Sequence, residues 1–418
     1  MNRLYVDYKA VSQKRTAILH LMFFACAMGC FSSISQGQGR ELSVFLLDQN
    51  VLLKIRHDCQ RHDKKYEASL DRLKMEADAL LNHVPPSVVS KSQVPPSGDK
   101  HDYMSLAPYW WPNPDSKDSL PYIRRDGQVN PEIGSIKDHA YLAAMAQAVQ
   151  KLSLAYFYTG NERYAIKATA FLEVWFLNPD TKMNPHLKFG QAVRGLNVGR
   201  GIGLIETRWF SVVIDGIGLL RGSKAWTKRD EDGMKQWFEQ YFAWLQNSPL
   251  AHDERDWGNN HGVWFDVQYC SIALFTGHRD LAVQELLQAK TKRIAAQIEP
   301  DGRMPKELER TKSLGYTTFD LQAFTQLACL GEHIGVDLWF YKTSDGRSIR
   351  KALDWVLPFI AGESKWEFQQ IDHYNPGSAY PILRLAARHF SNVKYEEIAQ
   401  KVKHQSATWY LTDLMYGY

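Results

Sequence analysis

The 418-residue sequence contains little of what marks several common protein classes. It has five cysteines, and only Cys59, Cys270 and Cys329 remain if an N-terminal export signal is removed. An odd number of widely spaced cysteines predicts neither a disulfide framework nor a CxxC metal site. The net charge is +4 and no Lys/Arg-rich block occurs, so we expect no nucleic-acid partner.

Two further absences narrow the class of protein to which this chain can belong. Alternating strand patterns are scarce, and no glycine-rich phosphate loop occurs. His252, Asp253 and His261 could in principle ligate zinc, but their spacing is not compact. We therefore expect neither a metal nor a cofactor.

Apolar and aromatic residues, by contrast, are plentiful. The chain is 44% hydrophobic and 12% aromatic, with thirteen tryptophans and twenty tyrosines. That is enough for a sizeable core and argues against a disordered protein. Most of these rings belong to a core, but flat aromatic faces also suit sugar rings, so the composition hints at a carbohydrate ligand.

The N-terminus is typical of an export signal. Lys14 and Arg15 precede the apolar stretch "TAILHLMFFACAMGC", and small and polar residues follow. We expect residues 1–35 to be a signal peptide, or a lipoprotein signal with the lipid on Cys30, because "AMGC" is an imperfect lipobox. The stretch is too short for a confident membrane span. We expect a periplasmic or cell-surface protein with no membrane span in the mature chain.

Helical periodicity dominates the rest of the chain. Apolar residues recur at about 3.6-residue spacing in segments such as "DHAYLAAMAQAVQKLSLAYFY" and "GVWFDVQYCSIALFT", which turn signals separate. The sequence predicts an all-α fold, an α/α toroid of six to seven antiparallel helical hairpins. We expect residues 36–418 to form a single, monomeric catalytic domain. A Pro-, Ser- and Asp-rich stretch with aromatic residues, at about 84–135, is predicted to be an ordered arm.

Two motifs carry the candidate chemistry. In "DWGNNHGVWFD" (256–266) one asparagine suffices to cap the following helix, which leaves the second asparagine and the histidine unexplained. In "PKELERTKSLGYTTFDLQAF" (305–324) Arg310 and Tyr316 stand at the entrance of another helix. Helix N-termini favour anions, so Asn260, His261, Arg310 and Tyr316 suit a carboxylate-bearing substrate.

That set of side chains suits β-elimination of a uronate polysaccharide. Asn260 and Arg310 can stabilise the carboxylate as charge develops on it when the C5 proton leaves. In mannuronate and glucuronate the C5 proton and O4 lie on the same side, so Tyr316 alone can serve as base and acid. In guluronate they lie on opposite faces, which makes His261 the base and Tyr316 the acid. Nearby cations, Arg310 among them, are expected to lower the pKa of Tyr316.

Three stretches resemble the bacterial alginate lyase superfamily, most closely the Bacteroides-type polysaccharide lyase family 38, which is related to family 5. They are "HDYMSLAPYWWPNP…LPYIRRDGQVNPE", "DWGNNHGVWFDVQ" and "ERTKSLGYTTFDLQAF", and the resemblance covers nearly all of the mature chain. It implies an α/α toroid that cleaves alginate or glucuronan by elimination. It also places the family's Asn-His pair on Asn260 and His261, and its Arg and Tyr on Arg310 and Tyr316.

Further residues are candidates for holding an acidic polysaccharide. They are aromatic side chains for stacking and polar or cationic side chains for acidic sugars: Tyr109, Trp110, Trp111, Arg125, Arg208, Trp257, Asn259, Lys306 and His373. Arg124, the neighbour of Arg125, belongs to the same group.

Two alternatives stay open at this point. A glycoside hydrolase on the same toroid needs two carboxylates flanking the bond, for which Asp215, Asp256 and Asp320 are available but do not look like a pair. A non-catalytic surface protein that only binds polysaccharide is the other. The preferred uronate and the choice between endo and exo cleavage also stay open.

Overall fold

The computed structural model describes residues 42–417. The expected export signal, with Cys30, lies outside the described residues. Between residues 42 and 417, no helix combines the length and the hydropathy that crossing a membrane requires. The described residues belong to one compact unit.

Helices account for most of the described chain, which confirms the all-α prediction. The α-helices are α1 (Gln49–Gln60), α2 (Lys64–Leu80), α3 (Asp138–Thr159), α4 (Glu162–Leu172), α5 (Phe210–Leu220), α6 (Lys228–Asn247), α7 (Pro249–Asp256), α8 (Asn260–Thr276), α9 (Arg279–Ala289), α10 (Pro305–Leu308), α11 (Ser313–Ile334), α12 (Ile349–Ile360), α13 (Tyr380–Phe390), α14 (Val393–Lys403) and α15 (Trp409–Tyr416). The strands are β1 (Met104–Leu106), β2 (Trp110–Trp111), β3 (Ile123–Arg124) and β4 (Phe189–Ala192), and a 3-10 helix η4 spans Gly201–Trp209.

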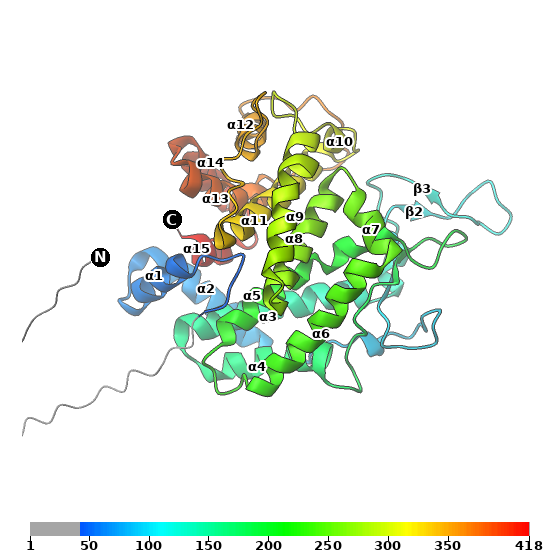
Figure 1. The fold of residues 1–418 in the computed structure, drawn as a ribbon, viewed down its shortest axis with the longest axis horizontal. Helices are drawn as coiled ribbons and strands as arrows, with labels where there is room; N and C mark the ends of the chain where they lie inside the picture. Colours follow the sequence, from blue (N-terminus) through cyan, green and yellow to red (C-terminus); the bar gives the residue numbers. More distant parts are fainter. Residues whose placement is uncertain (1–41, 418) are drawn as a thin grey trace, which may run out of the picture. The chain divides into compact units, whose positions relative to one another are not determined.

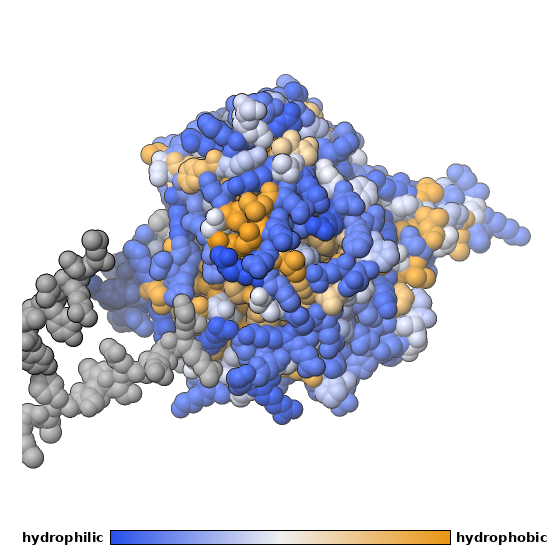
Figure 2. Space-filling model, viewed as in Figure 1, coloured by the Kyte–Doolittle hydropathy of each residue, from blue (hydrophilic) through white to orange (hydrophobic). Residues whose placement is uncertain are grey.

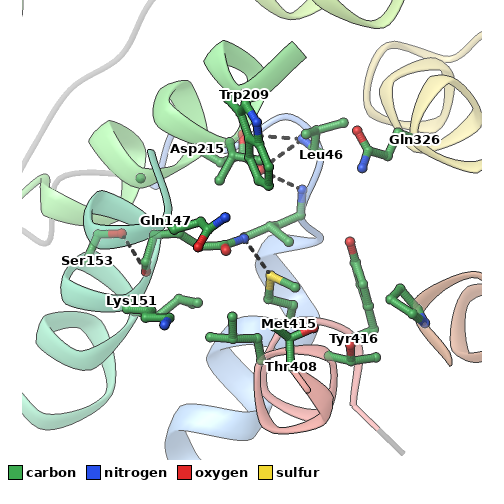
Figure 3. A pocket seen from close by; sticks show the side chains of 18 of the residues that line it. Leu46, Gln147, Lys151, Ser153, Trp209, Asp215, Gln326, Thr408, Met415 and Tyr416 are labelled. Carbon is green, nitrogen blue, oxygen red and sulfur yellow. Dashed lines mark hydrogen bonds between the residues drawn. The ribbon is translucent and has the colours of Figure 1, made fainter. Parts of the chain in front are cut away.

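The helices pack as an inner and an outer ring, and Figure 1 shows α8 of the inner ring beside α9 of the outer ring. Residues of α3, α5, α8, α11, α13 and α15 surround a central cavity of about 290 Å³, which makes these helices the inner ring. Figure 3 shows this cavity, with Trp209 and Asp215 on one side of it and Met415 and Tyr416 on another. Helices α4, α9, α12 and α14 each pack against an inner helix and do not line the cavity. The face seen in Figure 2 is mostly hydrophilic.

Helix α8 is the most enclosed element, and its sequence explains how it begins and ends. It is buried on nearly all sides, as expected of a helix that is apolar all round. The Asn259 side chain caps its first turn, and Gly277 ends it in the left-handed conformation. Gly262 is required near the start, because a Cβ there would lie 2.1 Å from the Trp257 carbonyl oxygen. The "NNHG" stretch therefore lets the preceding loop cross very close to the helix.

The segment 84–135 is ordered and tied to the toroid by buried polar groups. Its strands β2 and β3 form an antiparallel ribbon, and β1 pairs in parallel with β4. Figure 1 shows the ribbon projecting beyond the helices, near α7. Lys91 and Asp138 form a fully buried ion pair of 2.9 Å. Glu206 accepts hydrogen bonds from Tyr103 (2.6 Å) and Ser105 (2.7 Å).

Asp215 fastens the first described residues to the inner ring. Its carboxylate accepts the backbone N–H groups of Phe45 (2.7 Å), Leu46 (3.1 Å) and Leu47 (2.9 Å). One turn further along α5, Gly218 leaves room for this segment, because a Cβ there would lie 2.2 Å from the Ser43 carbonyl oxygen. Burial raises the pKa of Asp215 to about 7, against the lowering effect of the three N–H groups.

We expect Asp215→Ala to lower the free energy of unfolding by about 3 kcal/mol, because three buried N–H groups lose their acceptor. Urea denaturation would measure it. Asp232→Ala is the matched control, since Asp232 only pairs with Lys228 on the surface and should cost under about 0.5 kcal/mol. A loss for Asp215→Ala no greater than that of the control would contradict this role.

Candidate active site

A cleft of about 720 Å³ opens where the arm approaches the toroid. Its walls come from β2 and the arm, from η4, from the start of α8, and from the segment that runs through α10 into α11. The lining residues are Pro108, Tyr109, Trp110, Arg124, Gln191, Arg200, Ile202, Ile205, Arg208, Trp257, Gly258, Asn259, Asn260, His261, Lys306, Glu309, Arg310, Tyr316 and Phe319.

The structure brings most of the candidate residues together in this cleft. Asn260, His261, Arg310 and Tyr316 all line it, and so do six of the nine candidate binding residues: Tyr109, Trp110, Arg208, Trp257, Asn259 and Lys306. Trp111, Arg125 and His373 are not among the lining residues. The Trp111 ring instead stacks with the Arg125 guanidinium at 5.3 Å, and its Nε1 donates to the Gln128 carbonyl.

The two asparagines have different tasks. Asn259 is the N-cap, and its Oδ1 accepts the backbone N–H of His261 at 3.1 Å. Asn260 is fully buried and held by Glu307, which accepts its backbone N–H (2.8 Å) and its Nδ2 (2.9 and 3.0 Å). Within the described chain its Nδ2 thus reaches both carboxylate oxygens of Glu307, and its Oδ1 is buried without a hydrogen-bond partner. Burial raises the pKa of Glu307, partly offset by these donors.

A second buried carboxylate holds the histidine. The Nδ1 atom of His261 lies 2.9 Å from Oε1 of Glu254, which has no solvent exposure. Burial raises the pKa of Glu254, and the neighbouring imidazole opposes that shift. Because Nδ1 faces Glu254, Nε2 is the nitrogen left for the cleft. The Trp257 ring lies 6.2 Å from the imidazole, and 44% of this tryptophan is exposed at the cleft.

The Arg310 side chain is held in place by Asp126, a residue of the arm. Nε and Nη2 of Arg310 donate to the carboxylate of Asp126 at 3.1 and 2.8 Å. Asp126 also accepts from Arg124 and from the backbone of Thr311. Burial works to raise the pKa of Asp126, but the hydrogen bonds and charge of Arg310 outweigh it and hold that pKa well below the ordinary value. The arm therefore fixes the guanidinium and leaves Nη1 as its unengaged end.

The tyrosine lies against both the arm and the arginine. Its hydroxyl is 2.8 Å from that of Tyr109, and the Arg310 guanidinium lies 3.7 Å from the centre of its ring. Burial raises the pKa of Tyr316 far above the ordinary value, although the charge of Arg310 works in the opposite direction. The expectation that cations lower this pKa is thus wrong in net effect, because loss of solvent outweighs one nearby charge. Tyr316 carries its proton in the free cleft.

Two further guanidinium groups face the cleft without a carboxylate partner within the described chain. Arg200 donates to the backbone and side chain of Gln191 at 3.0 Å, and Arg208 donates to the Ile205 carbonyl at 3.0 Å. Burial lowers the pKa of Arg200 to about 10, so it remains charged at neutral pH. Half-buried cations without a carboxylate partner are costly and are expected where an anionic ligand binds.

Several of these site residues were not predicted from the sequence. Arg200 stands between Gly199 and Gly201, where a Cβ would lie 2.0 Å from the Lys188 carbonyl oxygen and 2.4 Å from Oδ2 of Asp253. Two neighbouring glycines that permit close backbone contact were the available signal. Glu307 gave no signal, because in "PKELERTK" it looks like one more charge on a solvated face. Between residues 42 and 417, no cluster of three or more His, Cys, Asp or Glu side chains has the geometry to hold a metal ion.

A family model described as alginate lyase matches residues 87–366. The crystal structure of an alginate lyase from Bacteroides ovatus is 41% identical, with a TM-score of 0.85, and the match covers 90% of this chain and 99% of that one. No curated protein matches the sequence.

More distant structures share the fold alone. A variant of alginate lyase A1-III in complex with a tetrasaccharide is 16% identical, with a TM-score of 0.58 over 91% of this chain and 97% of that one. Alginate lyase A1-III from Sphingomonas species A1 is 17% identical, with a TM-score of 0.51 over 77% and 88% of the two chains.

The Tyr316 phenol should keep its proton at about pH 10, where an exposed tyrosine is half ionised. Labelling the tyrosine ring carbons with ¹³C and following their chemical shifts with pH would test this, with Tyr316→Phe assigning the signal. The Tyr316 resonance should stay at its neutral position while exposed tyrosines shift. Ionisation of Tyr316 at or below pH 10 would mean that the Arg310 charge outweighs burial.

Proposed function

Because this chain belongs to the alginate lyase family and is a polysaccharide lyase, we propose that it cleaves alginate by β-elimination in the cleft, leaving a 4,5-unsaturated uronate end. One observation carries the proposal. The protonated Tyr316 lies with its ring against the Arg310 guanidinium and its hydroxyl beside that of Tyr109, in a cleft that Asn260 and His261 also line. Polymannuronate and glucuronan are both substrates that this chemistry allows.

The charge of the cleft supports an acidic polymer. Within the described chain it is lined by Arg124, Arg200, Arg208, Lys306 and Arg310, against one acidic residue, Glu309. Such a surface attracts a polyanion and places counter-charges along its carboxylates. The rings of Tyr109, Trp110 and Trp257 offer flat faces to the sugars between those charges.

For mannuronate, the proposed step uses Tyr316 alone. Asn260 and Arg310 bind the carboxylate and stabilise the negative charge that develops on it as the C5–H bond breaks. The Tyr316 oxygen takes the C5 proton while its own proton passes to O4. The electron pair of the C5–H bond forms the C4–C5 double bond, and the C4–O4 bond breaks. This step requires no tyrosinate, in agreement with the raised pKa.

For guluronate, the C5 proton faces away from O4, so two groups are needed. Nε2 of His261 takes the C5 proton, and Tyr316 gives its proton to O4. Arg310 and Asn260 keep the same task at the carboxylate. One cleft then serves both sugars with the same acid and a different base.

The three aspartates considered for a glycoside hydrolase do not line the cleft. Asp215 is engaged by three backbone N–H groups beside the central cavity, and Asp320 is fully buried. Asp256 is exposed at the end of α7 and is not among the residues that line the cleft. Among the residues that the structure describes, Glu309 is the only acid that lines the cleft, which leaves no flanking carboxylate pair there.

We also propose that the protein acts as a monomer in the periplasm or on the cell surface. The charged and apolar pattern of residues 1–35, with a lipid on Cys30 as the variant form, supports export. A polymer substrate outside the cytoplasm agrees with that location.

Wild-type protein incubated with polymannuronate, polyguluronate or glucuronan should produce the ultraviolet absorbance of a conjugated C4–C5 double bond. Tyr316→Phe should lower this rate by at least about 1,000-fold on every polymer that is cleaved, because the O4 oxygen then has no proton donor. New reducing ends without the absorbance would identify a hydrolase and contradict the elimination.

Arg200→Met should lower kcat/KM on polymannuronate by about tenfold, mainly through KM, because one charge–carboxylate contact is lost. Steady-state kinetics at two salt concentrations would measure it, and the variant should also show a weaker dependence on salt. Arg194→Met is the control, since this half-exposed arginine pairs with Glu132 and does not line the cleft. Equal effects of the two variants would argue against a carboxylate contact at Arg200.

A further inference from the structure

Glu254 is a buried carboxylate on α7 whose side chain contacts a single polar partner among the described residues. Its Oε1 lies 2.9 Å from Nδ1 of His261, while its Oε2 is buried without a hydrogen-bond partner. Neither arginine nor lysine pairs with it at ion-pair distance; the nearby Arg255 pairs with Glu285 instead. Burying a carboxyl group that pairs with no arginine or lysine and accepts from no backbone N–H group lowers the stability of the fold.

The contact decides which imidazole nitrogen carries a proton. A carboxylate accepts hydrogen bonds, so Nδ1 must be the protonated nitrogen of a neutral His261 that faces it. Nε2 then presents a lone pair toward the cleft. The α7–α8 connection supports this orientation, because Asn259 caps α8 through the His261 backbone N–H and Gly262 allows the Trp257 carbonyl to approach closely.

We propose that Glu254 is the positioning residue that makes His261 the base for guluronate, by holding the imidazole with Nδ1–H turned inward and the Nε2 lone pair in the cleft. Without this contact, Nε2 would carry the proton and His261 would be a hydrogen-bond donor to the substrate carboxylate. The inference rests on the proposed β-elimination and adds the reason why the cleft can process both sugars.

A comparison of the rates on polyguluronate and polymannuronate distinguishes a positioning role of Glu254 from a merely structural one. Only the guluronate reaction needs a lone pair at Nε2, because Tyr316 serves mannuronate as both base and acid. A general base contributes about 100-fold to 10,000-fold to the rate. Loss of the Glu254 contact should therefore reduce kcat on polyguluronate by at least about 100-fold, and kcat on polymannuronate by less than about fivefold.

The first measurement requires no mutation. The ¹⁵N chemical shifts of His261 in the labelled wild-type protein, recorded at mildly alkaline pH, report which nitrogen is protonated. Signals are assigned with His261→Asn. The expected result is a protonated Nδ1 and an unprotonated Nε2. A protonated Nε2 overturns the inference.

The second measurement uses Glu254→Met, which keeps the side-chain volume and removes the acceptor. The ¹⁵N spectrum should show the proton moved to Nε2, and the polyguluronate rate should fall selectively through kcat rather than KM. Glu254→Asp should restore part of that rate. Asp232→Asn removes a charge from an exposed position of α6, where Asp232 pairs only with Lys228, and should leave both rates near wild type.

Equal losses on both polymers would show that Glu254 only supports the fold, and they would overturn the inference. Wild-type protein that cleaves polymannuronate but not polyguluronate would also overturn it, while leaving the proposed function intact. A wild-type protein that eliminates neither polymer would instead remove the proposed function itself.

Discussion

The contact between Glu307 and Asn260 joins the two segments that carry the cleft chemistry. Glu307 belongs to α10, shortly before Arg310, and it binds both the backbone and the side chain of the first residue of α8. Each hydrogen bond is between buried groups, so neither partner can release the other without leaving a polar atom unsatisfied. Through this link, the start of α8 with His261 and the start of α11 with Tyr316 keep a fixed relation. The geometry of the cleft depends on it.

The electrostatics of the cleft divide into two layers. Carboxylates lie beneath or behind the reactive groups, where Glu254, Glu307 and Asp126 each hold one of them. The guanidinium groups of Arg200 and Arg208, which have no carboxylate partner between residues 42 and 417, face the open space. The first layer positions the chemistry, and the second is unfavourable until an anion arrives. Such an arrangement exchanges stability of the free protein for affinity toward a polyanion.

The sequence predicted the elements with strong periodicity and the residues whose type was surprising for their place. Two of these residues, Asn260 and His261, stood out because helix capping does not require them. Tyr316 stood out because it lies at the entrance of a helix. The buried partners could not be predicted. Glu307 sits in a run of charges. Asp126 becomes important only because folding places it beside Arg310, and Glu254 because folding buries it against the His261 imidazole. The net rise in the pKa of Tyr316 depends likewise on burial, which no local pattern encodes.

The most direct test of the account is a crystal structure of Tyr316→Phe with a mannuronate tetrasaccharide bound in the cleft. The account predicts that one sugar places its carboxylate within hydrogen-bond distance of Asn260 Nδ2 and Arg310, with C5 and O4 both facing the position of the missing hydroxyl. It also predicts a second carboxylate at Arg200 or Arg208. A sugar bound with its carboxylate toward solvent, or with O4 turned away from residue 316, would contradict the proposed elimination.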